Sequence, residues 1–208
     1  MGTKTAKLTI MKKYTTTSFA RTWVLATAAL LALPTWAAKE VKGVKFSDTY
    51  QVGGQTLQLN GAGLRVKIII DVYAAGLYVS KPDTAANAVI GQSGAKSMEI
   101  VLLRDLTGEE FAEAAVKGFK ANNSEADVSK FQPKLDEIKN LMTSFGTVKK
   151  GTVLHIDLVP GEGIHVLMNG KKTGPVISGD DFQPALLRIW LGNKPVDSDL
   201  KQSLLGGK

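Results

Sequence analysis

The sequence predicts an α+β domain in which a curved antiparallel sheet carries a layer of helices on one face. Strand-like runs are interleaved with amphipathic helical segments, and short glycine-containing turns join several strands as hairpins. The regular strand–helix alternation of a doubly wound parallel sheet is missing. No internal repeat, low-complexity run or linker divides residues 39–208, so we expect one domain there.

The sheet is predicted to begin with a hairpin. Residues 45–50 and 55–59 form its two strands, because they flank the turn-forming pair Gly53-Gly54. One long strand is then expected in the stretch of residues 59–79.

This long strand has two different faces. Its even-numbered positions, from Val66 to Tyr78, are almost wholly apolar, and we expect them to pack against the helices. Its odd-numbered positions begin with Arg65 and Lys67 and become apolar towards Val79. That gradient is typical of a wall that runs inwards from the mouth of a cleft.

Two long helices follow in the middle of the chain. They are preceded by a short helix and a buried strand, at residues 83–90 and 97–103. Thr107 and Glu110 have the spacing of a capping box, which predicts a helix to about Lys120. A second helix is predicted over residues 127–145. Both segments carry an apolar stripe at a period of 3.6 residues, and such a stripe is far more often core than partner groove.

The C-terminal part is predicted to contain a second hairpin and the last helices. Its strands are residues 152–159 and 164–168, followed by a strand at 176–178 and helices at 180–191 and 197–205. With the four-residue loop 160–163, His155 and His165 fall on opposite faces, which excludes a shared metal. His155 and Asp157 share a face, either as a base and its orienting acid or as solvent-facing polar positions. We predict no metal site and no cofactor.

Residues 1–37 have the features of a cleaved export signal. Basic residues (Lys12, Lys13 and Arg21) precede an apolar run of about ten residues, and small residues stand at Thr35 and Ala37. The run is too short to span a bilayer, which needs about 20 residues, so no membrane anchor is expected. Met11 is a possible true start. The expected location is the periplasm, with residues 38–208 as the mature domain.

Charge and cysteine content narrow the functional classes. The whole chain has 26 basic and 19 acidic residues, a net charge of +7. Five of the basic residues and none of the acidic ones lie in residues 1–37, so the mature part is only about +2. Nucleic-acid binding is therefore disfavoured. The chain has no cysteine, which excludes disulfides, a thiol nucleophile and lipidation of an N-terminal cysteine.

Arg65 is the main candidate functional residue. A guanidinium at the edge of a β layer needs a partner, and in one continuous strand Asp71 is about 20 Å away, beyond reach. The partner is therefore another strand, solvent or a ligand. Arg65 either extends into water or acts as a clamp for a carboxylate, an enolate or a carbonyl.

Several segments resemble the chalcone isomerase superfamily, and in particular its bacterial, secreted branch. They are Gly61-Ala62-Gly63 with Arg65, residues 72–78, the helix opening at 106–111, and the helix 184–191 with Gly192 and Pro195 after it. The resemblance covers residues 39–208 and implies an open-faced β-sandwich with a ligand cleft between the sheet and the two central helices.

The resemblance carries over only part of the family's catalytic set. The catalytic arginine falls on Arg65, and the threonine that polarises the substrate carbonyl falls on Tyr73. The helix tyrosine falls on Phe111, which has no hydroxyl, and an asparagine falls on Gly118, which has no side chain. This pattern points to the non-catalytic members, which resemble fatty-acid-binding proteins and hold a carboxylate with the arginine.

Two functions and a scaffold role remain open at this point. The first is a monomeric binding protein for an apolar carboxylate such as a fatty acid, with Arg65 on the head group and Tyr73 as hydrogen-bond donor. Phe111, Phe119 and Leu77 then form the apolar wall, unless the phenylalanines are simply core and Tyr73 a strand residue at a wet edge. The second is an intramolecular lyase of the chalcone–flavanone type acting through Arg65 and Tyr73. The third is a scaffold without ligand, in which Arg65 pairs with a cross-strand acid.

Overall fold

The computed structural model describes residues 1–3 and 39–207. Nearly all of the predicted export signal, including the predicted cleavage position, lies outside the described residues. Residues 39–207 belong to one compact unit with its own apolar core. No helix of the described residues is both long enough and apolar enough to cross a bilayer.

The main sheet has seven strands, all paired in antiparallel fashion, in the order β11-β10-β9-β6-β5-β4-β3. Its strands are β3 (Thr49–Val52), β4 (Gln55–Lys67), β5 (Ile70–Val79), β6 (Lys96–Leu102), β9 (Val153–Val159), β10 (Gly163–Met168) and β11 (Lys171–Lys172). Two further pairs stand apart from it: β1 (Lys39–Val41) with β2 (Val44–Phe46), and β7 (Leu106–Thr107) with β8 (Thr147–Val148). The predicted strand at 176–178 is reduced to a single bridge between Ile164 and Ile177.

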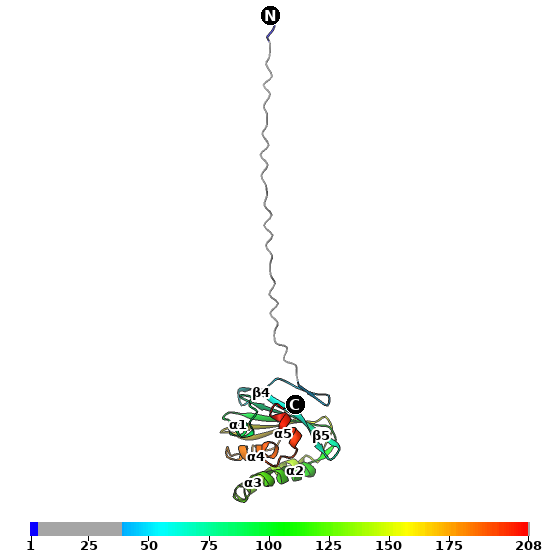
Figure 1. Cartoon of the computed structure of the whole chain (residues 1–208), viewed down its shortest axis with the longest axis vertical. Helices are drawn as coiled ribbons and strands as arrows, with labels where there is room; N and C mark the ends of the chain where they lie inside the picture. Colours follow the sequence, from blue (N-terminus) through cyan, green and yellow to red (C-terminus); the bar gives the residue numbers. More distant parts are fainter. Residues whose placement is uncertain (4–38, 208) are drawn as a thin grey trace. The chain divides into compact units, whose positions relative to one another are not determined.

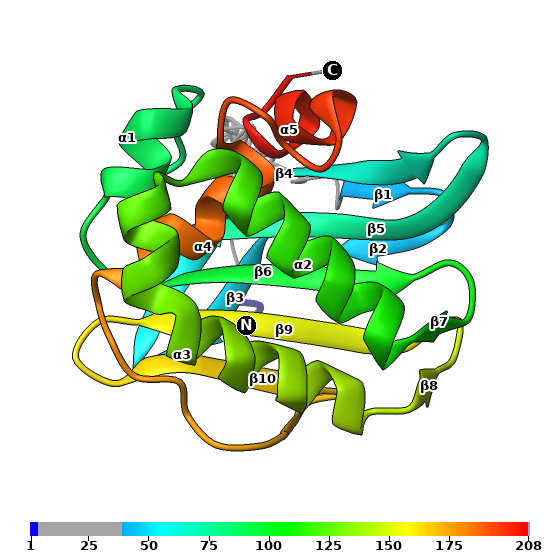
Figure 2. The ribbon, with the colours of Figure 1, turned by 90° about the horizontal axis from the view of Figure 1, so that it is seen from below.

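A layer of helices covers one face of the sheet, as predicted. The helices are α1 (Ala86–Gly91), α2 (Gly108–Asn122), α3 (Glu125–Ser144), α4 (Phe182–Leu191) and α5 (Ser198–Leu204). Figure 1 shows α2, α3 and α4 on one side of the strands, and Figure 2 shows α2 and α3 crossing in front of β6, β9 and β10. The largest apolar cluster lies between this layer and the sheet.

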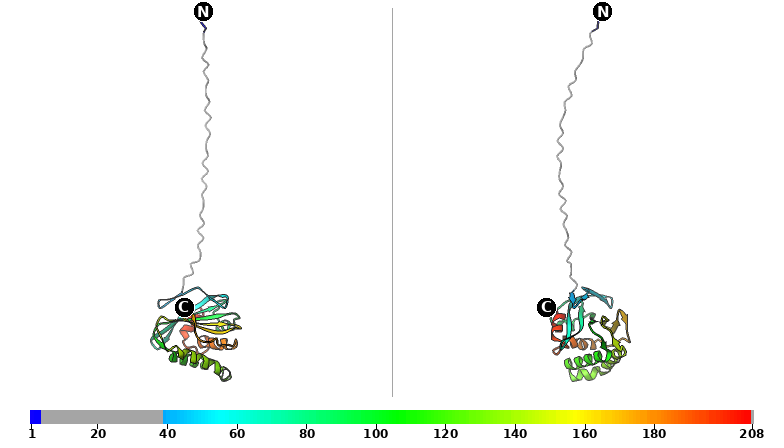
Figure 3. Two further views of the ribbon diagram at one scale, coloured as in Figure 1. Left: turned by 180° about the vertical axis from the view of Figure 1, so that it is seen from behind. Right: turned by 90° about the vertical axis from the view of Figure 1, so that its right-hand side faces the viewer.

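The sheet is strongly curved, which Figure 3 shows from two further sides. Although β3 is the last strand in the order, its Tyr50 ring stacks on His155 of β9 at 4.5 Å between ring centres. The β1–β2 pair closes a small second core on the face away from the helices, where Phe46 packs with Ala62 and Ala74. The predicted curved antiparallel sheet with helices on one face is confirmed.

The predicted long strand of residues 59–79 is wrong, because the chain reverses in its middle. β4 ends at Lys67 and β5 begins at Ile70, and the two pair as a hairpin. The turn contains Ile68 at a φ of 63°, a conformation that β-branched residues rarely adopt. Apolar alternation therefore continues through a turn that has no glycine, asparagine or proline.

The predicted assignment of the faces is also reversed over most of β5, although Val72 lies in the core under the helices as predicted. Tyr73, Ala75 and Leu77 of β5 pack in the core under the helices. The even-numbered Ala74 lies instead with Phe46 in the core on the opposite face.

The capping box at the start of α2 is confirmed. The Thr107 hydroxyl accepts from the Glu110 backbone N–H at 3.1 Å, and the Glu110 carboxylate accepts from the Thr107 N–H at 2.9 Å. The two central helices run antiparallel and meet closely at Gly108, where an added Cβ would lie 2.0 Å from the Met142 carbonyl oxygen.

The register predicted for the second hairpin is wrong by one residue. Gly163, at a φ of 125°, already belongs to β10 and pairs with Val159, so that His165 lies opposite Asp157. A shift of one residue moves every side chain of a strand to the other face. His155, Asp157 and His165 therefore share one face, away from the helices. No three metal-binding side chains converge anywhere in the described residues.

The C-terminal helix α5 packs on β4, where two glycines leave room for it. A Cβ at Gly61 would lie 2.2 Å from the Ser203 carbonyl oxygen, and one at Gly63 would lie 2.5 Å from the Ser203 Cβ. The helix buries Leu200 and Leu204 completely. The last residues of the described chain thus complete the core beside β4.

Candidate functional site

The β4–β5 hairpin places Arg65 and Tyr73 directly opposite each other. They are register partners, and the guanidinium carbon lies 5.4 Å from the centre of the Tyr73 ring. A cation over an aromatic face is stabilised by about 0.5–2 kcal/mol, depending on its exposure to water. The two polar groups that the sequence proposed for a binding site are thus brought together, although by a hairpin and not by one continuous strand.

The Arg65 guanidinium has no acidic partner. No carboxylate in the described part of the chain lies within ion-pair distance of it. Its Nε is buried and has no hydrogen-bond partner among the same residues. Asp197, on the neighbouring segment, accepts hydrogen bonds from the backbone N–H groups of Val66, Asp199 and Leu200. The cross-strand acid that the scaffold interpretation requires as a partner of Arg65 is therefore not present among the described residues.

The Tyr73 hydroxyl is held by Trp190 of α4. Trp190 Nε1 donates a hydrogen bond of 3.0 Å to the Tyr73 hydroxyl oxygen, and Tyr73 is only 1% exposed. Burial raises the pKa of this hydroxyl, while the adjacent positive charge of Arg65 acts in the opposite direction. The hydroxyl thus keeps its proton at neutral pH and has that proton available to donate to an acceptor beside Arg65.

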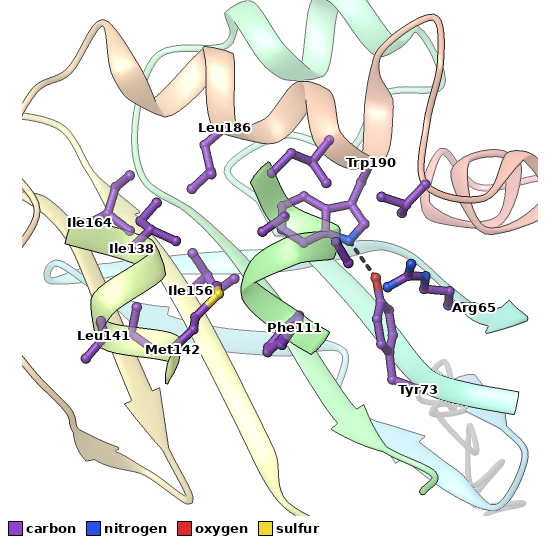
Figure 4. A pocket seen from close by; sticks show the side chains of 15 residues that line it. Arg65, Tyr73, Phe111, Ile138, Leu141, Met142, Ile156, Ile164, Leu186 and Trp190 are labelled. Carbon is purple, nitrogen blue, oxygen red and sulfur yellow. Dashed lines mark hydrogen bonds between the residues drawn. The ribbon is translucent and has the colours of Figure 1, made fainter. Parts of the chain in front are cut away.

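A narrow apolar cavity begins at these three residues and runs between the sheet and the helices (Figure 4). Its wall is otherwise aliphatic or aromatic, and its members are Phe111, Ala114 and Ala115 of α2, Ile138, Leu141 and Met142 of α3, Ile156, Ile164 and Val166 of the sheet, Leu186 and Ile189 of α4, and Val196. Of the residues that line it, only Arg65 and Tyr73 are ionisable. The lining has no carboxylate, histidine or lysine.

The cavity is almost closed. Its free volume is only about 20 Å³. Pockets that bind small molecules usually offer about 300–1,000 Å³. A long ligand therefore has to separate the walls, and the unbranched side chain of Met142 on α3 is flexible enough to move.

Arg65 lies where this cavity meets the surface. On its outer side an open groove is lined by Arg65, Lys67, Glu110, Lys117 and Val196, among others. Arg65, Ala114 and Val196 border both spaces. The guanidinium is thus positioned between water and an apolar interior, which is a suitable place for the head group of an amphipathic molecule.

The other predicted site residues fall in different places. Phe111 lines the cavity, as expected of a wall residue. Phe119 and Leu77 do not line it, and Phe119 packs in an aromatic group with Phe131 and Phe182 at 6.3 and 5.5 Å. Gly118 is the close contact between α2 and α4, since a Cβ there would lie 3.0 Å from Ile189.

Sequence reasoning did not identify Trp190 as part of the site. The sequence pattern placed Trp190 only in the apolar stripe of the last long helix. The signal that could have identified it as a site residue was its indole N–H. A buried indole needs an acceptor, and in the structure that acceptor is the Tyr73 hydroxyl.

A second group of polar residues lies on the opposite face of the sheet. Asp157 accepts hydrogen bonds from Ser97 at 2.6 Å and from Tyr50 at 3.3 Å, while Glu99 accepts one from Tyr78 at 2.9 Å. Burial raises the pKa of both carboxyl groups, and burial lowers the pKa of His155. The idea that His155 and Asp157 face solvent is therefore wrong. None of these residues borders the apolar cavity.

Comparison with known proteins bears on the whole domain. A family model described as chalcone isomerase-like matches residues 38–206. The chain belongs to the chalcone isomerase-like family. The crystal structure of an Arabidopsis thaliana fatty-acid binding protein resembles this chalcone isomerase-like protein with a TM-score of 0.59 and 19% sequence identity, over 78% of this chain and 92% of that one. At this identity the likeness establishes the shared fold. No curated protein sequence matches the chain significantly.

Proposed function

We propose that this chalcone isomerase-like protein binds an apolar carboxylate of the fatty-acid class, without converting it chemically, in the periplasm. The observation that carries the proposal is the partly buried Arg65 guanidinium, which has no carboxylate partner among the described residues and lies at the mouth of an apolar cavity. A carboxylate there gains charge-assisted hydrogen bonds from Arg65 and one from the Tyr73 hydroxyl. The hydrocarbon part of the ligand then leaves water and contacts the apolar wall of the cavity.

The fold of the neighbouring solved structure supports the same class of ligand, since that protein is described as a fatty-acid binding protein. The periplasmic location rests on the sequence of residues 1–37. A mature domain without cysteine also suits an oxidising compartment, because it has no thiol to be oxidised.

The composition of the cavity favours binding over catalysis. An intramolecular lyase of the chalcone type needs its phenol nucleophile deprotonated and its enolate stabilised. No carboxylate or histidine lines the cavity to accept that proton, and burial keeps the Tyr73 hydroxyl protonated. Phe111 and Gly118 supply neither of the polar donors that the catalytic members carry. The lyase thus stays the second candidate, tested by the loss of chalcone absorbance above the spontaneous rate.

The binding proposal is tested with decanoate and decanol, which differ in head group but share a chain length. Trp190 is the sole tryptophan of residues 38–208, so its fluorescence reports on the cavity directly. We expect decanoate to bind more tightly than decanol, and Arg65→Gln to weaken decanoate binding about 10- to 100-fold, as the loss of a charge-assisted hydrogen bond implies. Decanol binding should hardly change.

Arg104→Gln is the matched control. Arg104 is partly buried and its Nε, like that of Arg65, has no hydrogen-bond partner among the described residues, but it pairs with Glu110 at 3.3 Å and does not line the cavity. Its variant should bind decanoate like the wild type. Equal binding of decanoate by the wild type and by Arg65→Gln would remove Arg65 from the site. Organic extraction of the natively purified protein should in addition release an acidic, lipid-like molecule, and it should release less from Arg65→Gln.

A further inference from the structure

The turn that joins β4 and β5 exposes consecutive apolar side chains to water. Ile68 is 91% exposed, Ile69 87% and Ile70 53%. Single exposed apolar residues are common on protein surfaces, but a contiguous group at the end of a hairpin marks an interaction surface. We call Ile68, Ile69 and Ile70 the isoleucine tip. Figure 2 shows the turn at the end of the sheet that is remote from α1.

The backbone gives no reason for isoleucine at this turn. Ile68 has a φ of 63°, where its branched side chain is strained and where glycine or asparagine fits more easily. A turn residue chosen for folding alone would not be β-branched. The side chain of Ile68 therefore has its use outside the fold, in contact with something apolar.

The surroundings of the isoleucine tip are basic. Arg65 and Lys67 precede it on β4. Asp71, the residue that follows the tip, is paired with Lys42 of the β1–β2 turn at 3.0 Å, whereas neither Arg65 nor Lys67 has a carboxylate within ion-pair distance among the described residues. An apolar tip that follows two uncompensated basic side chains complements a surface that is anionic outside and apolar inside. An anionic phospholipid bilayer has this structure.

The same hairpin forms the mouth of the cavity. Arg65, Val66 and Lys67 line the groove that leads to the apolar interior, and Arg65 borders the cavity itself. A bilayer in contact with the isoleucine tip would therefore also lie against the mouth of the cavity. An apolar carboxylate dissolved in a bilayer could then enter the cavity without crossing bulk water.

We propose that the isoleucine tip docks this protein on an anionic phospholipid bilayer. The cavity takes up its ligand from this bilayer and releases the ligand back into it. This inference rests on the proposed function for the identity of the ligand. It does not depend on the ligand for the docking step, which follows from the tip and its charges alone.

The test is sedimentation of residues 38–208, which hold the self-contained core, with vesicles. One set contains phosphatidylglycerol and phosphatidylethanolamine, and the other contains phosphatidylcholine only. The wild type should bind the anionic vesicles, more weakly as salt is raised, and bind the neutral ones less. The triple variant Ile68→Asn/Ile69→Ser/Ile70→Thr should lose at least about tenfold in binding. Circular dichroism verifies its fold.

Val176→Ser provides the matched control, because Val176 is also an exposed apolar residue, at 46%, and lies on the segment after β11. Its vesicle binding should equal that of the wild type. Equal binding by the triple variant would overturn the proposal. So would sedimentation velocity showing that the wild type forms a dimer that the triple variant cannot form, since the tip would then be occupied by a second copy.

Soluble decanoate separates this proposal from the proposed function. The triple variant should bind decanoate as the wild type does, because the cavity is unchanged. A wild type that binds vesicles but not decanoate would refute the proposed ligand and leave the docking surface standing. A wild type that binds decanoate but not anionic vesicles would refute the docking surface alone.

Discussion

The Arg65 guanidinium lies 5.4 Å from the centre of the Tyr73 ring, across two strands that are joined by a short turn. Both polar groups of the candidate site therefore come from one hairpin, and their separation is set by the sheet register. Trp190 fixes the tyrosine from the helix layer at 3.0 Å. A ligand head group would meet a preformed pair of donors, while the apolar wall behind them has to open.

Tyr73→Phe should reduce both affinity and stability. Loss of one donated hydrogen bond weakens decanoate binding about three- to tenfold. The Trp190 N–H also loses its acceptor in a buried place, which lowers the free energy of unfolding by about 1–3 kcal/mol. Fluorescence titration and urea unfolding measure the two effects. Tyr78→Phe, which removes a hydrogen bond to Glu99 on the other face, should lower stability without affecting affinity.

Ile68→Asn should stabilise the domain. The present side chain is held at a φ of 63°, and asparagine adopts this region more easily, so the free energy of unfolding should rise by about 0.5–1 kcal/mol. Urea unfolding tests this. Ile69→Asn is the control, because Ile69 is equally apolar and 87% exposed but does not have a positive φ. A gain of the same size in both variants would argue against strain at Ile68.

His155 should make stability depend on pH in the acidic range. Burial lowers its pKa in the folded state, so the unfolded chain takes up a proton first as the pH falls. Its contribution to stability is therefore complete above the unfolded pKa of about 6.5 and is lost as the pH falls through the folded pKa. The free energy of unfolding should drop less between pH 7 and pH 5 in His155→Gln than in the wild type.

Glu99 complicates this measurement, because burial raises its pKa and its stabilising contribution changes in the opposite direction with pH. The comparison is therefore made in a Glu99→Gln background as well. Identical pH profiles with and without His155 in that background would contradict the prediction.

Export should remove the leader. Mass spectrometry of the full chain, produced in a Gram-negative host and recovered from its periplasm, should give a mass that begins after Ala37 or Ala38. Replacement of Ala37 by a bulky residue, Ala37→Phe, should leave the uncleaved form, because the cleavage site requires small residues. A full-length protein in the cytoplasm of cells expressing the wild type would refute the predicted location.

The sequence predicted most elements because their signals are local. The capping box at Thr107 and the stripes of α2 and α3 depend on neighbours three or four residues apart, and the Gly53-Gly54 turn is a local signal too. The fold class also followed, since strands and amphipathic helices in this order leave few ways to bury their apolar faces.

The centre of the site could not be derived in this way. The run Lys67-Ile68-Ile69-Ile70-Asp71 has high strand propensity and no turn residue, so the hairpin that pairs Arg65 with Tyr73 was hidden. The partnership of Tyr73 with Trp190 joins residues far apart in the chain. The faces of His155 and His165 depended on a single residue, Gly163, whose conformation closed the loop one position earlier than expected.

The seating of α5 on Gly61 and Gly63 has a consequence for how the chain matures. β4 precedes α5 by most of the length of the domain, so a chain emerging from the ribosome leaves β4 bare on this side until residues 198–204 have been made. The core beside β4 therefore closes late, after the other strands and helices of the domain are already available to pack.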